Sequence, residues 1–267
     1  MGQIWLLARI TFIEGVRNRV LIGILIFAVL LLLLNLIFAQ MFTYDLSKVA
    51  VDTGLTMVSI AGLAIIFFMG INLLSRDFEK RTIYMVISRP LARWQYVFGK
   101  FLGLMLMVGL SVAILGSFAA ICVKLIILWA PGYVPPNFTW LLFWLSLIFS
   151  FLSLLIVTAL AQLFASFATS SYIALLLTAC CYFIGHNVEM LSKLVSGSED
   201  LHILIRFLIG AVTWIFPNLS AFDLKTAAGY GLPVEGSAML WVALYGVSYI
   251  FIVLFLNAFI FQRKELG

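Results

Sequence analysis

Long apolar runs alternate with short polar stretches along this chain, and the lengths of the apolar runs predict membrane helices. Residues 20–39 carry no formal charge and form a run of twenty residues, enough for a helix to cross a hydrocarbon core about 30 Å thick. This run exceeds the hydrophobic region of a signal peptide, and no small-residue cleavage site follows it, so we expect a retained helix. We expect six transmembrane helices in all, over residues 20–39, 54–74, 95–123, 138–165, 172–187 and 238–261.

The stretch before the first span has the pattern of an amphipathic helix. Between residues 3 and 19, apolar side chains recur at helical spacing on one side, and polar side chains lie roughly opposite. The apolar side holds Trp5, Ala8, Phe12 and Val16, and the polar residues are Glu14, Arg17, Asn18 and Arg19. We expect an elbow helix that lies in the membrane surface.

The most charged stretch, residues 75–100, separates the second and third spans and is called the hinge below. It holds eight of the chain's twenty-seven formal charges. Asp77 and Arg81 are four residues apart in the favourable acid-first order, and Phe78, Thr82, Met85 and Val86 fall on another helical face. The residue before Pro90 avoids the helical conformation. The pattern therefore predicts a short amphipathic helix over residues 77–89, although a plain solvated loop is the simpler alternative.

Between the fifth and sixth spans, residues 188–236 mix charges with one apolar piece. That piece, residues 207–216, is followed by Pro217 and is too short to cross a bilayer as a helix. We expect a re-entrant or interfacial segment on the outer side. The polar string 166–171 is the expected turn between the fourth and fifth spans.

Composition and charge fix the class and the orientation. With 64% hydrophobic and 10% charged residues, a chain of 267 residues cannot bury its apolar surface as a globule, so it is predicted to be an all-α integral membrane protein. The elbow, hinge and carboxyl-terminal tail hold eleven of the sixteen Lys and Arg residues. By the positive-inside rule, both termini and the hinge are expected in the cytoplasm. Topology thus explains the net charge of +5 without a nucleic-acid partner.

Several function classes lose support because their residues are missing. No predicted span carries an ionisable side chain near its middle, where gradient-driven carriers usually have one, although unwound backbone carbonyls can also bind sodium. Gly99 and Lys100 are followed by Phe101, so the P-loop pattern that binds nucleotide phosphates is not formed there. We therefore expect no catalysis and no cofactor in this chain. Energy would have to arrive through contact, for which the hinge offers the largest polar surface.

Polar residues within the spans are candidates for a substrate pathway or for helix packing. Membrane helices use Ser and Asn for packing more often than for transport. The pathway candidates are Asn35, Asn72, Ser150, Ser153 and Asn257. His186, His202, Glu189 and Asp200 flank the outer segment, but their spacing matches no standard metal site, so no metal is expected. Gly99 and Gly103 form a GxxxG pattern, a weak packing signal.

The order of these features resembles a known family. The resemblance rests on three groups of residues and on the basic tail of this chain. The elbow contributes Glu14 and residues 16–19, and the segment before the last span contributes Pro217, Asn218, Leu219 and Phe222. The hinge contributes Glu79, Lys80, Arg81, Thr82, Ser88, Arg89, Pro90, Gly99 and Lys100. The whole chain resembles the permease subunit of ABC-2 type transporters, and more narrowly the permeases associated with multicopper-enzyme maturation.

The resemblance implies an assembly in the cell (inner) membrane. Two permease copies would form an exporter above two separate ATPase subunits, which would bind ATP and Mg. Residues 77–89 would be the coupling helix that contacts the ATPase, and residues 188–236 would contain the outer re-entrant pair. The coupling residues would be Asp77, Phe78, Glu79, Lys80, Arg81, Thr82 and Arg89. Membrane lipid and a periplasmic accessory protein are further candidate partners.

Two other functions stay open. The first is a mechanotransducing membrane subunit that uses the same kind of ATPase but transports nothing. The second is a channel or scaffold without an ATPase.

Overall fold

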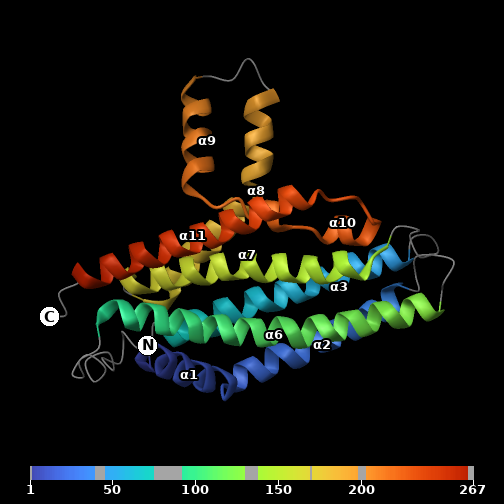
Figure 1. Ribbon diagram of the computed structural model, residues 1–267, viewed down its shortest axis with the longest axis horizontal. Helices are drawn as coiled ribbons and strands as arrows, with labels where there is room; N and C mark the ends of the chain where they lie inside the picture. Colours follow the sequence, from blue (N-terminus) through green and yellow to red (C-terminus); the bar gives the residue numbers. More distant parts are fainter. Residues whose placement is uncertain are drawn as a thin grey trace.

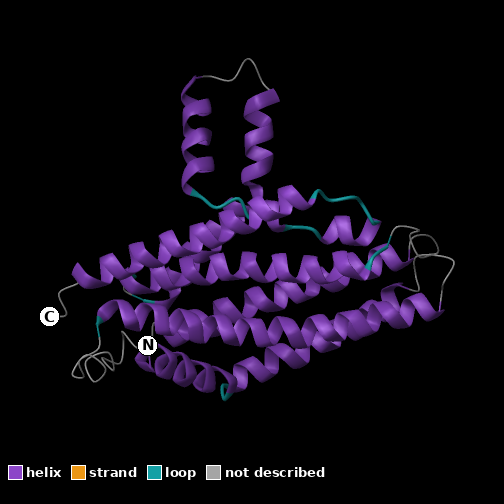
Figure 2. Cartoon of the chain, in the orientation of Figure 1, coloured by secondary structure: helices purple, strands orange, loops and turns teal. Residues whose placement is uncertain are grey.

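The computed structural model describes residues 2–39, 46–74, 92–129, 138–168, 170–197 and 203–263. Within these ranges the chain is helical, with short loops and no strand (Figure 2). The predicted all-α class is therefore confirmed for this part of the protein. Hinge residues 75–91, with all seven predicted coupling residues from Asp77 to Arg89, lie outside the described residues.

The long helices match the predicted order of spans. The helical elements are α1 (Gly2–Val16), α2 (Arg19–Ala39), α3 (Leu46–Ile65), the π-helical η1 (Ile66–Gly70), α6 (Arg93–Trp129), α7 (Trp140–Phe167), α8 (Ser171–Gly197), α9 (Ile203–Ile215), the 3-10 turn η3 (Ser220–Phe222), α10 (Lys225–Tyr230) and α11 (Gly236–Arg263). Five stretches are long and apolar enough to cross a membrane: Lys48–Leu74, Trp94–Trp129, Trp140–Phe167, Ser171–Lys193 and Gly236–Gln262. The pair Gly2–Val16 and Leu21–Leu34, bent by 61°, passes the same test only together, so the described residues contain five candidate spans, or six if this pair is one broken span. The predicted separation into a surface elbow and a first span at residues 20–39 stays a prediction.

Helix α6 lies inside the bundle and contacts α1, α2, α3, α7 and α11. Both chain termini lie at the end of the bundle where α6 begins (Figure 1), and this is called the terminal end below. The buried core runs along the shared faces of these helices, with Leu55, Ile65, Leu104 and Leu115 at most 1% exposed. The predicted arrangement of elbow, hinge and tail at one end is thus consistent with the helix directions.

Two glycines allow α1 to lie directly on α6. A Cβ on Gly103 would approach Thr11 Cβ to 2.6 Å and the Ala8 carbonyl oxygen to 2.8 Å. At Gly99 a Cβ would approach Leu7 Cβ to 2.8 Å. The GxxxG pattern, weak in the sequence, therefore marks a real close contact, since only residues without a side chain let the two backbones approach this far.

The predicted apolar side of the elbow is only partly the buried side. Ala8, Thr11 and Gly15 form the buried side of α1, whereas Trp5 is 63% exposed. The sequence analysis predicts the buried side of the helix from hydrophobicity, but helices that pack closely bury their small side chains. The bulky apolar residues of α1 are thereby left on its outer surface.

Several helices extend beyond the predicted spans. Helix α3 begins at Leu46 rather than residue 54, and α8 continues to Gly197 rather than ending at residue 187. The polar end of α8 stays helical because Glu189 and Lys193, four residues apart, form an ion pair of 2.6 Å in the favourable order. The predicted turn at 166–171 is confirmed, because α7 ends at Phe167 and α8 begins at Ser171.

The outer segment contains a helical arm. Helix α9 ends at Ile215, two residues before Pro217, and packs against α8. In Figure 1, α9 and the second half of α8 stand side by side, away from the rest of the bundle. Trp214 at the base of α9 is 90% exposed. The apolar piece at residues 207–216 thus belongs largely to α9, and its re-entrant or interfacial position in the membrane stays a prediction.

Candidate functional site

Polar side chains surround a small cavity between α3, α7, α8 and the η3–α10 segment. Its volume of about 30 Å³ is room for one or two water molecules. Apolar walls are supplied by Leu154, Leu219 and Phe222. The polar lining consists of Ser59, Ser150, Ser153, Tyr182, His186, Asp223 and Lys225.

Helix α7 supplies two hydroxyl groups to the cavity from one face, because Ser150 and Ser153 are three residues apart. Some other hydroxyls in the bundle donate to the carbonyl four residues earlier, as Thr158 does to Leu154 at 2.8 Å, whereas Ser146 Oγ on the same helix has no partner among the described atoms. Ser150 is only 6% exposed, yet its hydroxyl makes no hydrogen bond with the described residues. A buried hydroxyl without a partner has its full capacity available to whatever enters the cavity.

The chain after α9 is fixed against α8 and closes the cavity. Leu219 N donates to the Gly185 carbonyl oxygen at 2.9 Å. A Cβ at position 185 would lie 2.6 Å from the Pro217 carbonyl oxygen, so a glycine is required for this approach. Asn218 Oδ1 accepts from Ala221 N at 3.3 Å, which shapes the η3 turn.

The charged part of the cavity lining is one ion pair. Asp223 Oδ2 lies 3.6 Å from Lys225 Nζ, and Asp223 Oδ1 accepts from Lys225 N at 3.2 Å at the start of α10. The Lys225 side chain is 13% exposed and that of Asp223 31%. Asp52 on α3 interacts electrostatically with both residues. The Asp223–Lys225 ion pair, together with the serine hydroxyls, Tyr182 and His186, suits a polar guest that can both donate and accept hydrogen bonds.

The structure brings together two of the five predicted pathway residues. Ser150 and Ser153 line the cavity, whereas Asn72 is exposed elsewhere and its Nδ2 donates to the Phe68 carbonyl oxygen at 2.6 Å. Asn257 is fully buried between helices. The side chain of Asn35 lies outside the described part of the chain.

Sequence reasoning missed the charged part of this site. The sequence analysis does not place Asp223 or Lys225 among the candidate site residues. The signal that could have found them is the turn sequence from Asn218 to Lys225, whose Asn and Asp side chains shape tight turns. Such a turn can return a short polar segment to the bundle.

A second polar group lies inside the helix packing nearer the terminal end. Gln162 Nε2 donates to the Val97 carbonyl oxygen at 2.8 Å, and its Oε1 has no partner among the described atoms. Both polar atoms of the Asn257 side chain likewise have none there. These amides sit in contacts between α6, α7 and α11 rather than in an open pathway, and unpartnered buried amides cost free energy.

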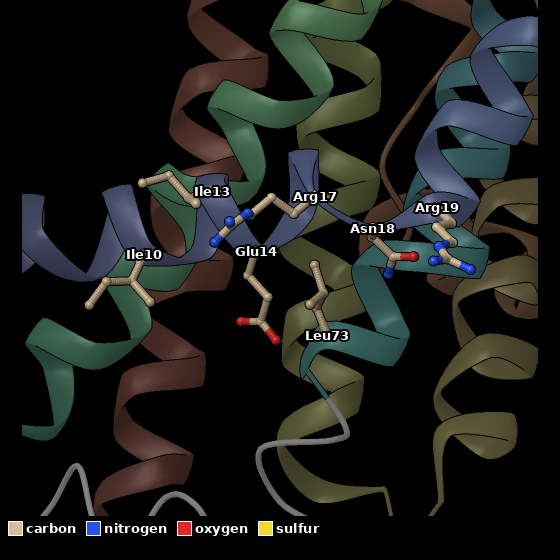
Figure 3. A pocket seen from close by; sticks show the side chains of 7 residues that line it. All are labelled: Ile10, Ile13, Glu14, Arg17, Asn18, Arg19 and Leu73. Carbon is tan, nitrogen blue, oxygen red and sulfur yellow. The ribbon is translucent and has the colours of Figure 1, made fainter.

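At the terminal end, three of the five predicted elbow residues line one groove (Figure 3). Glu14, Arg17 and Arg19 surround a space of about 720 Å³ between α1, α2 and Leu73. Phe12 instead packs against the core, and Trp5 faces outward. The elbow charges therefore gather beside the last described residues before the hinge.

The residues considered for a metal site have other contacts or are not described. His186 stacks on Tyr182 with ring centroids 5.7 Å apart, and Glu189 pairs with Lys193. Asp200 and His202 lie outside the described ranges. The absence of a metal stays a prediction.

Comparison with known proteins identifies the family. Residues 5–266 match the model of the family described as ABC-2 family transporter protein. No characterised protein matches the sequence significantly. A match over nearly the whole chain agrees with a bundle of membrane-length helices. The chain is therefore a multi-pass membrane protein that belongs to the ABC-2 transporter family.

Proposed function

We propose that this chain is the permease subunit of an ATP-binding cassette exporter. Two copies form the substrate pathway, and two separate ATPase subunits, which bind ATP and Mg, dock on the hinge at residues 77–89. Both termini lie in the cytoplasm, and ATP hydrolysis takes place in the partner rather than in this chain. The family match and the multi-pass bundle support the membrane role.

The observation that carries this proposal is the packing of the helices on either side of the hinge. The stretch that ends at Leu74 and helix α6, which begins at Arg93, pack against each other. Helix α1 is held on α6 through Gly99 and Gly103. A force applied to the hinge would therefore move α1, α3 and α6 as connected elements.

The π-helical segment η1 gives this connection a point where it can bend. Residues Ile66–Gly70 lie between α3 and the hinge, and π-helical segments occur mostly as local irregularities at functional sites. Above η1, Ser59 on α3 reaches the polar cavity. A change in bend at η1 would alter the gap between α3 and α7, so the cavity is the closed form of the pathway in this proposal.

One observation favours the second candidate, a mechanotransducing subunit. The arm formed by the second half of α8 and by α9 stands away from the bundle (Figure 1) and exposes large apolar side chains, among them Phe207 at 73% and Trp214 at 90%. Such an arm can press on the membrane or on an outer partner without any transport. Transport and mechanotransduction share the ATPase, so they differ only in whether substrate moves.

The test is co-purification with an ATP-binding cassette ATPase, and the genes that neighbour this one are the first place to look for it. Glu79→Lys or Phe78→Asp should lower recovery of the ATPase at least fivefold in co-purification. Glu235→Lys, an equal charge reversal at an exposed position on the outer side, is the control and should leave recovery unchanged. Full ATPase recovery with both hinge variants contradicts the proposal.

A labelling experiment separates transport from mechanotransduction. Cysteine is placed at Ser153 in a Cys180→Ser background, because Cys180 is an exposed native thiol. In proteoliposomes with the ATPase, a membrane-impermeant thiol reagent should label position 153 faster during ATP turnover. Unchanged labelling, with ATP hydrolysis intact, favours mechanotransduction.

A further inference from the structure

The groove at the elbow combines charged and apolar walls. Glu14, Arg17 and Arg19 form its polar side, and Ile10 and Ile13 form an apolar side, with Leu73 opposite α1. Figure 3 shows Glu14 and Arg17 on the last turns of α1 and Arg19 at the start of α2, on either side of Asn18. Its volume of about 720 Å³ falls within the usual range for small-molecule sites, about 300–1,000 Å³.

The charges of this groove are not matched within the described chain. Glu14, Arg17 and Arg19 make no ion pair with any residue that the structure describes. The formal charges of these three residues sum to +1, and the two guanidinium groups lie on opposite sides of Asn18 (Figure 3). Guanidinium groups suit phosphate oxygens, and a carboxylate suits an ammonium group.

The apolar wall shows what kind of molecule reaches the groove. Ile10 is 53% and Ile13 41% exposed, and the exposed surface of α1 continues through Leu6 and Trp5. An exposed apolar helix face beside charges at the end of a membrane bundle is the pattern of an element in the lipid interface. A guest must therefore be amphiphilic, with acyl chains along the isoleucines and a polar head at the charges.

We propose that the elbow groove binds one aminophospholipid of the phosphatidylethanolamine type. The lipid phosphate accepts from Arg17, the primary ammonium donates to Glu14, and Arg19 adds positive charge beyond Asn18 (Figure 3). A choline headgroup cannot donate a hydrogen bond to Glu14, and a glycerol headgroup leaves this carboxylate without a positive partner. The charge order along the groove therefore selects a headgroup with both a phosphate and a primary amine.

The test is native mass spectrometry of the purified full chain with equal amounts of phosphatidylethanolamine, phosphatidylcholine and phosphatidylglycerol. The unsubstituted protein should retain phosphatidylethanolamine about two- to fivefold better than phosphatidylcholine, the range for one partly exposed charge contact. Glu14→Gln should abolish that preference, and Glu14→Asp should keep part of it. Arg17→Gln combined with Arg19→Gln should weaken retention of all three lipids.

The control is Arg9→Gln, which removes an exposed positive charge from the same helix outside the groove. It should leave the lipid preference unchanged. Equal retention of phosphatidylethanolamine and phosphatidylcholine by the unsubstituted protein overturns the proposal. The proposal is also overturned if Arg9→Gln reduces the lipid preference as much as Glu14→Gln does. A photo-crosslinker at Ile13 should capture phosphatidylethanolamine in nanodiscs. Capture of the hinge or of the ATPase instead would make the groove a protein contact and overturn the proposal as well.

Discussion

Substitution of Gly103 by alanine tests the close contact between α1 and α6. In a helix without steric conflict, Gly→Ala gains about 0.5–1 kcal/mol, because alanine loses less backbone entropy on folding. At position 103 the new methyl group would meet the Ala8 carbonyl oxygen at 2.8 Å and Thr11 Cβ at 2.6 Å. Overpacking of this kind costs about 1–3 kcal/mol. We expect a net loss of about 1–2 kcal/mol in the free energy of unfolding.

The measurement is thermal unfolding of the purified protein with a fluorogenic thiol dye. Cys122 and Cys181 are buried and become reactive on unfolding, while Cys180→Ser removes the exposed thiol. Gly103→Ala should lower Tm by several degrees, at about 2–4 °C for each kcal/mol. Gly23→Ala, where no atom lies within 4 Å of the added Cβ, is the matched control and should hold or raise Tm. An equal or higher Tm for Gly103→Ala would refute the close contact.

Three further predictions concern the cavity and the hinge connection. Lys225→Gln should lower the free energy of unfolding by about 1–3 kcal/mol in thermal unfolding, because it leaves Asp223 without its partner. The control Lys193→Gln should lower it by under about 0.5 kcal/mol, because the side chains of its ion pair are 75% and 44% exposed. Equal losses for the two variants would contradict the argument from burial. In Gly70→Ala the added Cβ lies no nearer than 3.9 Å to any neighbouring atom, so the substitution should raise Tm. It should also slow ATP-driven labelling at position 153. Unchanged labelling would show that η1 is not part of the mechanism. Ser150→Ala should leave Tm within about 1 °C, since its hydroxyl has no partner among the described residues, and a large loss would reveal a structural bond.

The number and order of the membrane helices could be predicted from the sequence, because membrane length and apolarity are local properties. The ends of the helices could not. Helix α8 continues past residue 187 because Glu189 and Lys193 support it, and a hydropathy pattern treats both as reasons to stop. The end of a hydrophobic run and the end of a helix are therefore different boundaries.

The candidate site was predictable only where it depends on span residues. Ser150 and Ser153 were found because hydroxyls within an apolar run stand out. Asp223 and Lys225 reach the cavity only because Gly185 lets the chain at Pro217 approach α8, and a tertiary contact of this kind leaves no periodic signal. Asn257 is fully buried between helices, and its place in a substrate pathway stays a prediction.

The length of α6 has a mechanical consequence. An unbroken helix of 37 residues extends about 55 Å, nearly twice the thickness of the hydrocarbon core. A tilt of about 10° at one end of such a rod displaces the other by about 10 Å. Small angular changes on one side of the membrane can therefore become large translations on the other, without any melting of the helix between them.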